Sequence, residues 1–310
     1  MYKRQIVWSE GSHTSFYDQD WLRKNCYTIS NNKKYASPYQ LWDHSLQENL
    51  NSIKIEHDEI INSEEGLVKW LELLHYKGIA IVKNTPTKEE SAFPVLNRIS
   101  HTRETFFKTP FEVINIPKPN NSAYTAHALR NHMDLPWFEM PPGYQFLHCL
   151  INSAEGGQSS AVDGFAVADY LRKNEKETFE TLVNIPLKFK DNDYTQESIR
   201  SFHAPAISLT KDNDFNDIRF SVATMDILDC HPDDMERVYK AHHRLGNLLH
   251  DVKFQIKFRL NPGDILNIFI KQSDIDGTLL TACQVGKKLE ISGKNLLFQF
   301  LYYKPILFYI

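Results

Sequence analysis

Several features that mark other classes of protein are missing from this sequence. No apolar run approaches the roughly 18 residues that a membrane-spanning helix needs, and no apolar segment follows residues 1–5 to mark a secretory signal. Basic residues are not in surplus, because 35 Lys and Arg stand against 39 Asp and Glu, for a net charge of −4. We therefore expect a cytoplasmic protein that binds neither membranes nor nucleic acid.

Paired cysteines are missing as well. The four cysteines are scattered, form no Cys-x-x-Cys pair, and are typical of reduced thiols in a cytosolic protein; they are Cys26, Cys149, Cys230 and Cys283. The chain does have enough apolar residues, 42% of 310, to bury a full core. This composition suits a soluble globular protein of one large domain, or of one domain and a small addition.

A short motif, Asn131-His132-Met133-Asp134, carries the first chemical signal. Residues two apart on an extended strand point to the same face, so we expect His132 and Asp134 to lie on one strand with their ligating atoms converging. With a third ligand from elsewhere, this pair would make the facial triad of non-heme Fe(II) oxygenases. A bare His-x-Asp also occurs as a surface ion pair, so the surrounding motifs decide between the two interpretations.

Those surrounding motifs follow one another in a fixed order. They are 21–26 (WLRKNC), 41–42 (LW), 77–82 (KGIAIV), 103–105 (RET), 121–125 (NSAYT), 142–143 (PG), 147–149 (LHC), 156–159 (GGQS), 162–165 (VDGF), 171–172 (LR) and 260–264 (LNPGD). With the His-x-Asp pair they resemble the γ-butyrobetaine dioxygenase and trimethyllysine dioxygenase family, in the taurine-dioxygenase-like group of Fe(II)/2-oxoglutarate oxygenases. The resemblance implies a mainly β, α+β fold, in which a double-stranded β-helix (jelly roll) is flanked by helices. Residues 1–55 would form a vestigial N-terminal domain and residues 56–310 the oxygenase domain.

The resemblance also implies a reaction. It is hydroxylation of an unactivated C–H bond in a small zwitterion, a trimethylammonium carboxylic acid such as γ-butyrobetaine, as in carnitine biosynthesis. Fe(II), 2-oxoglutarate and O2 would be required, with ascorbate as reductant. Family members often hold zinc through a cysteine cluster after the motif that ends at Cys26, but no second cysteine follows here, so we expect no structural zinc. A second copy of the chain, in a homodimer, is the only protein partner expected.

The resemblance assigns roles to particular positions. His132 and Asp134 become the first two iron ligands. Leu147 and Ser159 fall where the family lines the 2-oxoglutarate pocket, although a plain core role suits Leu147 equally well.

The substrate side of the site rests on three further residues. Tyr124 matches an aromatic residue that helps to cage the quaternary ammonium group, and Asn131 lies beside the first iron ligand. Where the family can show tyrosine after the ligand aspartate, this chain has Leu135. Trp137 either replaces that lost ring or packs in the core. Cation–π attraction gives a well-placed ring in such a cage about 0.5–2 kcal/mol.

The C-terminal part departs from the family after the turn at residues 261–264. The family continues to a histidine that is the third iron ligand and to an arginine that grips 2-oxoglutarate through two hydrogen bonds. This chain has no histidine after His250 and no arginine after Arg259. Counting from the turn places Ile275 at the ligand position, and a slip of one residue places Asp276 there.

Three interpretations of this departure stay open. The last residues could be out of frame; the chain could be a divergent oxygenase with Asp276 as third ligand and Lys287 or Lys288 for the cosubstrate; or it could be an inactive relative that keeps the fold as a binding module. An oxygen donor suits Fe(II), but lysine lacks the fork of arginine. The next candidates for a third ligand are the histidines in the same half of the chain, His203, His242, His243 and His250.

Periodicity and turn residues predict the main elements of the oxygenase core. We expect helices at 64–76, 91–105, 166–173 and 232–251, and strands at 79–82, 144–151, 160–163 and 254–260, the last of them at a sheet edge.

Overall fold

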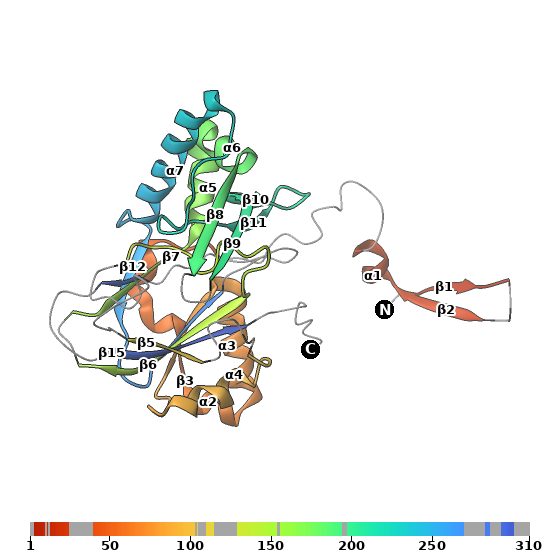
Figure 1. Ribbon diagram of the computed structural model, residues 1–310. Coiled ribbons are helices and arrows are strands. Elements are labelled where there is room, and N and C mark those ends of the chain that lie inside the picture. The colour runs from red at the N-terminus through yellow and green to blue at the C-terminus, as the bar shows by residue number, and fades with distance from the viewer. Residues whose placement is uncertain are drawn as a thin grey trace.

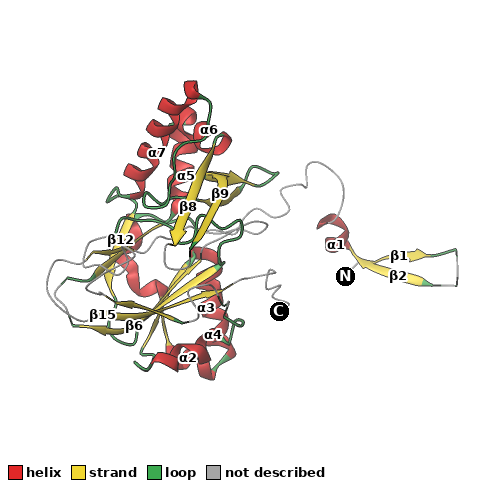
Figure 2. Cartoon of the chain, viewed as in Figure 1, coloured by secondary structure: helices red, strands yellow, loops and turns green. Residues whose placement is uncertain are grey.

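The computed structural model describes residues 3–9, 11, 13–24, 40–102, 104, 110–114, 129–153, 156–193, 197–269, 283–285 and 293–300. Its centre is a pair of β-sheets with helices on the outside (Figures 1 and 2). The larger sheet has the strand order β3 (Lys54–Glu56), β4 (Ile79–Lys83), β13 (Ile265–Phe269), β6 (Tyr144–Asn152), β15 (Gly293–Phe300) and β5 (Phe111–Ile114). The smaller sheet has the order β12 (Gln255–Arg259), β7 (Gln158–Val162) and β14 (Cys283–Val285).

Strand β6 shows how the larger sheet divides the core into two halves. Side chains alternate along a strand, so Phe146 and Leu150 face one side while Leu147 and Cys149 face the other. Phe146 and Leu150 belong to a hydrophobic cluster with the helices α2 and α3, whereas Cys149 belongs to a second cluster that also contains Ala161 of the smaller sheet. The second cluster therefore joins the two sheets, and it is this side of the larger sheet that carries the candidate site.

Short helices cover the first side of the larger sheet. They are α2 (His57–Asn62), α3 (Glu64–Lys77), η3 (Glu89–Ala92) and α4 (Phe93–Leu96). Helix η2 (His44–Ile53) lies on the other side, where its Leu46 and Ile53 belong to the cluster that joins the two sheets. Helix α3 begins where the Ser63 hydroxyl accepts a hydrogen bond from the Gly66 amide at 2.9 Å, and it ends at Gly78, whose φ of 67° favours glycine. Trp70 is fully buried, and its indole N–H donates to Asn267 Oδ1 of β13 at 2.8 Å. The buried face of α3 is thereby aligned with the sheet.

A second group of helices and hairpins lies beyond the smaller sheet, at the top of Figure 1. It consists of α5 (Gly164–Asn174), α6 (Lys176–Asn184), β8 (Pro186–Asp193), β9 (Ser198–Pro205), β10 (Ile207–Leu209), β11 (Phe215–Ile218), η5 (Pro232–Asp234) and α7 (Met235–Leu249). The N-terminal part contributes β1 (Lys3–Val7), β2 (Thr14–Asp18) and α1 (Gln19–Lys24). No helix in the described part of the chain has the length and apolar character needed to cross a bilayer.

The buried carboxylate of Asp163 connects the start of α5 to the segment before η2. It accepts hydrogen bonds from the amides of Phe165 at 2.9 Å and Ala166 at 3.2 Å, and from the amide of Trp42 at 3.0 Å. Trp42 is buried in the same cluster that joins the two sheets. The main core therefore takes in residues upstream of the predicted domain boundary at residue 55.

Most of the predicted elements are confirmed. The structure has α3, α5 and α7 at the predicted helices, β4, β6, β7 and β12 at the predicted strands, and β12 at the edge of its sheet. The predicted helix at 91–105 is wrong over residues 97–102, which are turns and irregular structure. Ala92, Val95 and Leu96 are buried, whereas Ile99, the next apolar residue, is only partly buried, and a helix is stabilised mainly by the burial of its apolar face.

The segment that departs from the family still contributes strands. Strand β13 leaves the turn at 261–264 and pairs with β4 and β6, while β15 pairs with β6 and β5 and β14 pairs with β7. The backbone of this segment is therefore part of both sheets, although its sequence lacks the expected motifs.

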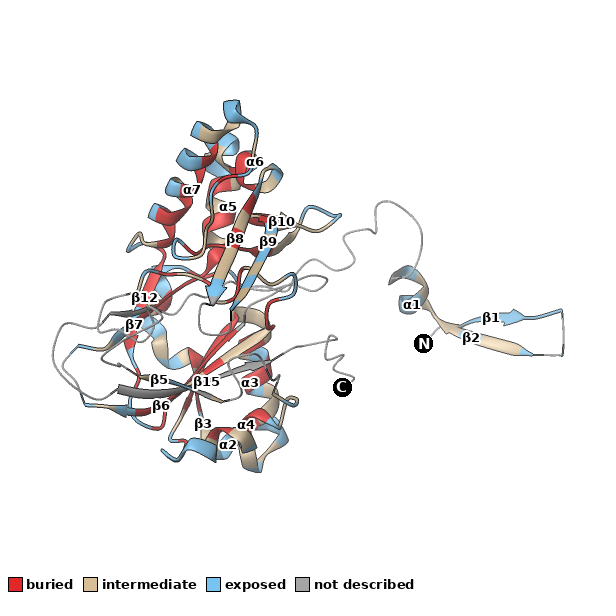
Figure 3. Cartoon of the chain, viewed as in Figure 1, coloured by how far each residue is buried: buried red, intermediate tan, exposed pale blue. Residues whose placement is uncertain are grey.

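One buried histidine makes a testable contribution to acid sensitivity. His148 on β6 is fully buried, and neither ring nitrogen has a hydrogen-bond partner in the described structure (Figure 3 colours the described residues by burial). Burial, with a smaller effect of nearby His57, lowers the pKa of His148 from 6.5 to about 4. The unfolded chain then binds the proton more tightly, so stability is complete above pH 6.5 and is lost as the pH falls towards 4.

We expect His148→Leu to remove this acid sensitivity. Lowering the pH from 7 to 4.5 reduces the free energy of unfolding of the parent chain. In His148→Leu this reduction should be smaller by roughly 2–3 kcal/mol. Urea unfolding at both pH values measures it, with the exposed His231→Gln as the matched control. An unchanged pH dependence in His148→Leu would show that His148 is not the group responsible.

Candidate metal centre

His132 and Asp134 lie in an irregular segment between residues 129 and 143, outside any strand, so the prediction of a common strand is wrong. The reason is that the backbone of this segment does not pair in a ladder. The amide of Met133 donates instead to the carbonyl of Phe220 at 2.9 Å, and the amide of Asn131 donates to Nε2 of His250 at 2.9 Å. Helix α7 and the chain after β11 therefore hold the segment in place.

The segment nevertheless keeps a two-residue alternation. Asn131, Met133 and Leu135 are buried, while the side chains of His132 and Asp134 remain 26% and 33% exposed. Leu135 then takes a φ of 59°, a left-handed conformation in which the chain turns away. The buried residues anchor the segment and leave the two candidate ligands together on the other side.

The two candidate ligands meet at hydrogen-bond distance. Nε2 of His132 lies 3.2 Å from Oδ1 of Asp134. Two ligands that each lie about 2 Å from one ion would be about 3 Å apart at a right angle. Nδ1 of His132 donates to the carbonyl of Arg130 at 2.7 Å, which leaves Nε2 as the nitrogen that faces Asp134. A metal-bound histidine usually has such a partner on its other nitrogen.

Gln145 is a residue of the candidate site that the sequence analysis missed. Its amide Nε2 donates to Oδ2 of Asp134 at 2.6 Å and so sets the orientation of the carboxylate. Gln145 lies two residues before Leu147 on β6, and both therefore point to the same side of the sheet. The expectation that Leu147 lines the site could have pointed to Gln145 through this spacing.

His132 and Asp134 each stabilise the charged form of the other. Burial lowers the pKa of His132, but the hydrogen bond and the charge of Asp134 outweigh it, so the pKa lies above its ordinary value. Burial raises the pKa of Asp134, but the hydrogen bonds and charge from His132 and the hydrogen bond from Gln145 outweigh it, so the net shift is downward. The carboxylate is therefore ionised at neutral pH and can bind a cation.

Arg219 braces the turn that follows the pair. This buried guanidinium pairs with Asp217 at 2.8 Å and donates to the carbonyls of Pro136 at 2.7 Å, Phe138 at 2.6 Å and Glu139 at 3.1 Å. No local sequence motif indicates this role of Arg219, because Arg219 and residues 136–139 come together only in the folded chain.

Asn131 was predicted to contact the substrate, but both polar atoms of its side chain are already hydrogen-bonded within the protein. Asn131 is 1% exposed; its Nδ2 donates to the carbonyl of Leu249 at 2.6 Å, and its Oδ1 accepts from the hydroxyl of Ser160 at 3.0 Å. The backbone amide of Asn131 also donates to His250, so the residue as a whole holds the segment in place. The physical reason is that a buried amide is stable only when it is hydrogen-bonded.

The other described site predictions have definite places. Leu147 packs against the cluster that joins the sheets, on the side that carries Gln145, and Trp137 packs against the same cluster. Ser159 is buried on β7. Because neighbouring residues on a strand face opposite sides, Ser159 faces away from the side on which Ser160 bonds to Asn131. Tyr124, Asp276 and Lys287 lie outside the described residues.

Within the described part of the chain, no group of three His, Cys, Asp or Glu side chains could hold a metal ion. His250 lies near the pair, but its Nδ1 donates to the carbonyl of Gly246 at 2.6 Å and its Nε2 accepts from Asn131, so both nitrogens are occupied. His203, on β9 of the β8–β9 hairpin, lies 3.5 Å from Asp229. The described donor set thus fits two ligand positions of an Fe(II) site.

Comparison with known proteins gives a consistent result. The profile of the taurine catabolism dioxygenase TauD, TfdA family matches residues 42–268, and it ends just after the turn where the sequence departs. γ-Butyrobetaine dioxygenase of Pseudomonas sp. (strain AK-1) is 30% identical over 262 residues, which are 84% of this chain and 67% of that protein. Mitochondrial trimethyllysine dioxygenase of Mus musculus is 31% identical over 271 residues, 85% of this chain and 63% of that protein.

Solved structures share the fold at low sequence identity. A complex of asparagine oxygenase with Fe(II), 2S,3S-3-hydroxyasparagine and succinate has a TM-score of 0.60 at 12% identity and covers 80% of this chain and 93% of that one. A putative alpha-ketoglutarate-dependent taurine dioxygenase from Burkholderia xenovorans also has a TM-score of 0.60, at 11% identity, over 84% and 90% of the two chains.

Proposed function

Because the chain belongs to the TauD/TfdA family of Fe(II)- and 2-oxoglutarate-dependent dioxygenases, we propose that its site is built to hydroxylate a trimethylammonium carboxylic acid of the γ-butyrobetaine type. The approach of His132 Nε2 to Asp134 Oδ1 at 3.2 Å carries the proposal. The names of relatives about 30% identical support this choice of substrate class.

The chain's own residues would do three things in such a reaction. His132 and Asp134 would hold Fe(II) on one side, with Arg130 and Gln145 fixing the direction of the two ligating atoms. Asn131 would keep the segment in register with α7. Bound Fe(II), with 2-oxoglutarate and O2, supplies the oxidation of the C–H bond, while the protein supplies position and shielding.

A second candidate function is a binding module without turnover. It is favoured by the finding that the described residues supply two metal ligands and no third. In the first candidate, Asp276 would complete the iron site, and Lys287, with Leu147, would bind 2-oxoglutarate, whereas Ser159 faces away from the iron ligands and would take no part. Both candidates share the substrate class and differ in whether the reaction occurs.

The substrate class is tested by the ring of Tyr124. We expect γ-butyrobetaine to bind the chain loaded anaerobically with Fe(II) and 2-oxoglutarate, and Tyr124→Leu to weaken that binding by about 2- to 30-fold, the equivalent of one caging ring. Tyr124→Phe keeps the ring and should bind like the parent chain. Isothermal titration measures all three, and equal affinity for the leucine and phenylalanine variants would exclude Tyr124 from a cage.

A further inference from the structure

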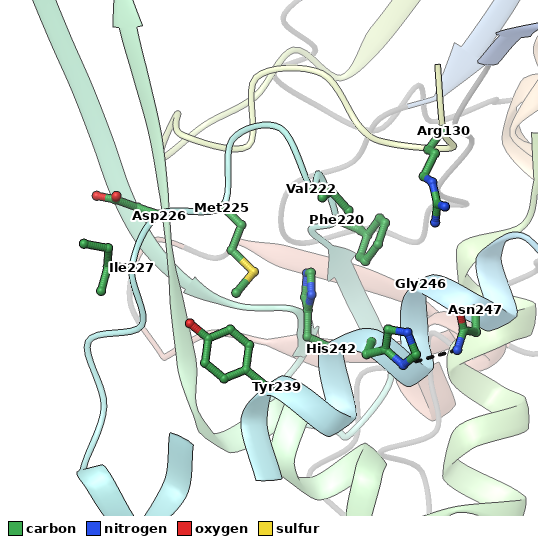
Figure 4. A pocket seen from close by; sticks show the side chains of 11 residues that line it. Arg130, Phe220, Val222, Met225, Asp226, Ile227, Tyr239, His242, Gly246 and Asn247 are labelled. Carbon is green, nitrogen blue, oxygen red and sulfur yellow. Dashed lines mark hydrogen bonds between the residues drawn. The ribbon is translucent and has the colours of Figure 1, made fainter. Parts of the chain in front are cut away.

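A pocket separate from the metal pair lies between helix α7 and residues 220–227 (Figure 4). Its volume is about 530 Å³, enough for a small organic molecule. Neither His132 nor Asp134 lines it, and no role in the proposed reaction uses it. The side chain of Arg130 reaches it from the metal-binding segment.

Most of the lining is apolar. Phe220, Met225 and Tyr239 point into the space from two elements (Figure 4). Gly246 lets the Phe220 ring lie close to α7, since a Cβ there would come within 2.9 Å of that ring. These side chains can bury a hydrocarbon chain, which is favourable in proportion to the apolar area removed from water.

His242 adds a polar atom that lacks a partner. The side chain is 8% exposed, its ring stacks on Phe220 at 4.8 Å, and its Nε2 has no hydrogen-bond partner in the described structure. Burial, with a smaller effect of His243, lowers the pKa of His242 to about 4, so the ring is neutral at pH 7. A buried polar atom without a partner is costly, and a ligand that accepts an N–H from it removes that cost.

The pocket lining carries one positive charge without an ion-pair partner among the described residues. Arg130 forms no ion pair with any other described residue, while the carboxylate of Asp226, which also lines the pocket, pairs with Lys188 at 3.3 Å. An unpaired guanidinium binds a carboxylate through two parallel hydrogen bonds. The pocket therefore suits a ligand with an anionic end and an apolar body.

We propose that this pocket is a second binding site, independent of iron, for a small carboxylic acid with an unbranched apolar chain. Its carboxylate is bound by Arg130 and accepts the N–H of His242, and its chain lies along Phe220 and Met225. This site goes beyond the proposed hydroxylation, because it needs neither the metal nor the cosubstrate.

The test uses hexanoate and metal-free protein, so that it is independent of the iron site. Isothermal titration should show saturable binding of hexanoate and none of pentylamine, which has the same alkyl chain and the opposite charge. Arg130→Gln and His242→Phe should each weaken binding about tenfold or more, because each removes a hydrogen bond to a charged group. His242→Phe keeps a ring that can stack on Phe220.

Two matched controls exclude general effects of charge and of buried histidines. Arg237→Gln removes an arginine of α7 that pairs with Asp234 outside the pocket, and His148→Leu removes a buried histidine of β6 that also lacks a partner. Both should bind hexanoate like the parent chain, and thermal unfolding checks that every variant folds.

Three results would overturn the proposal. They are the absence of saturation, unchanged affinity in Arg130→Gln, and competition between hexanoate and γ-butyrobetaine on the metal-loaded protein. Competition would show that the pocket is part of the substrate chamber. If hexanoate binds as expected while γ-butyrobetaine does not bind at all, the second site stands and the proposed substrate class fails.

Discussion

Asp134→Ala is expected to reduce Fe(II) affinity by more than about a hundredfold, because loss of an orienting partner outside the ligand shell alone costs about 10–100-fold. The carboxylate is ionised at neutral pH and lies 3.2 Å from His132, so its removal takes away the only anionic ligand of the described pair. Isothermal titration calorimetry with Fe(II) under anaerobic conditions measures the change in affinity.

Gln145→Leu should weaken Fe(II) binding less than Asp134→Ala does. It leaves both ligands but removes the 2.6 Å hydrogen bond to Asp134, so we expect an affinity loss of about 10–100-fold. Asp191→Ala is the matched control, since Asp191 pairs with Arg200 in the β8–β9 hairpin and contacts neither candidate ligand. If Asp134→Ala binds Fe(II) within a few-fold of the parent, the metal assignment is wrong.

Of the two candidate functions, the binding module without turnover predicts that the chain forms little or no succinate. With no histidine after His250 and no arginine after Arg259, it lacks the groups by which the resembled family completes the iron site and grips 2-oxoglutarate. Succinate release in the presence of Fe(II), ascorbate, 2-oxoglutarate and γ-butyrobetaine should therefore match the background of the Asp134→Ala variant.

Turnover above that background would identify the missing ligand. If it disappears in Asp276→Ala, the site is a His-Asp-Asp iron centre and the divergent oxygenase is established. If it persists, another residue completes the triad. No described histidine forms a three-ligand group with His132 and Asp134, so that residue would be sought outside the described part of the chain.

Local patterns predicted the parts of this protein that short-range forces decide. Helix α3 follows from its apolar spacing, a serine that caps its start and Gly78 at its end, all within one window of sequence. The helix predicted at 91–105 failed because its length depends on burial against other elements. Beyond Leu96, the described residues continue as turns rather than helix.

The candidate site divides in the same way. The sequence alone determined which residues could bind iron, because imidazole and carboxylate chemistry and the two-residue spacing of His132 and Asp134 are local properties. Only the tertiary structure decided how they are held. Gln145, Arg219 and His250 reach the segment from β6, from the chain after β11 and from the end of α7, and contacts between residues so far apart in the chain form only when the whole core packs.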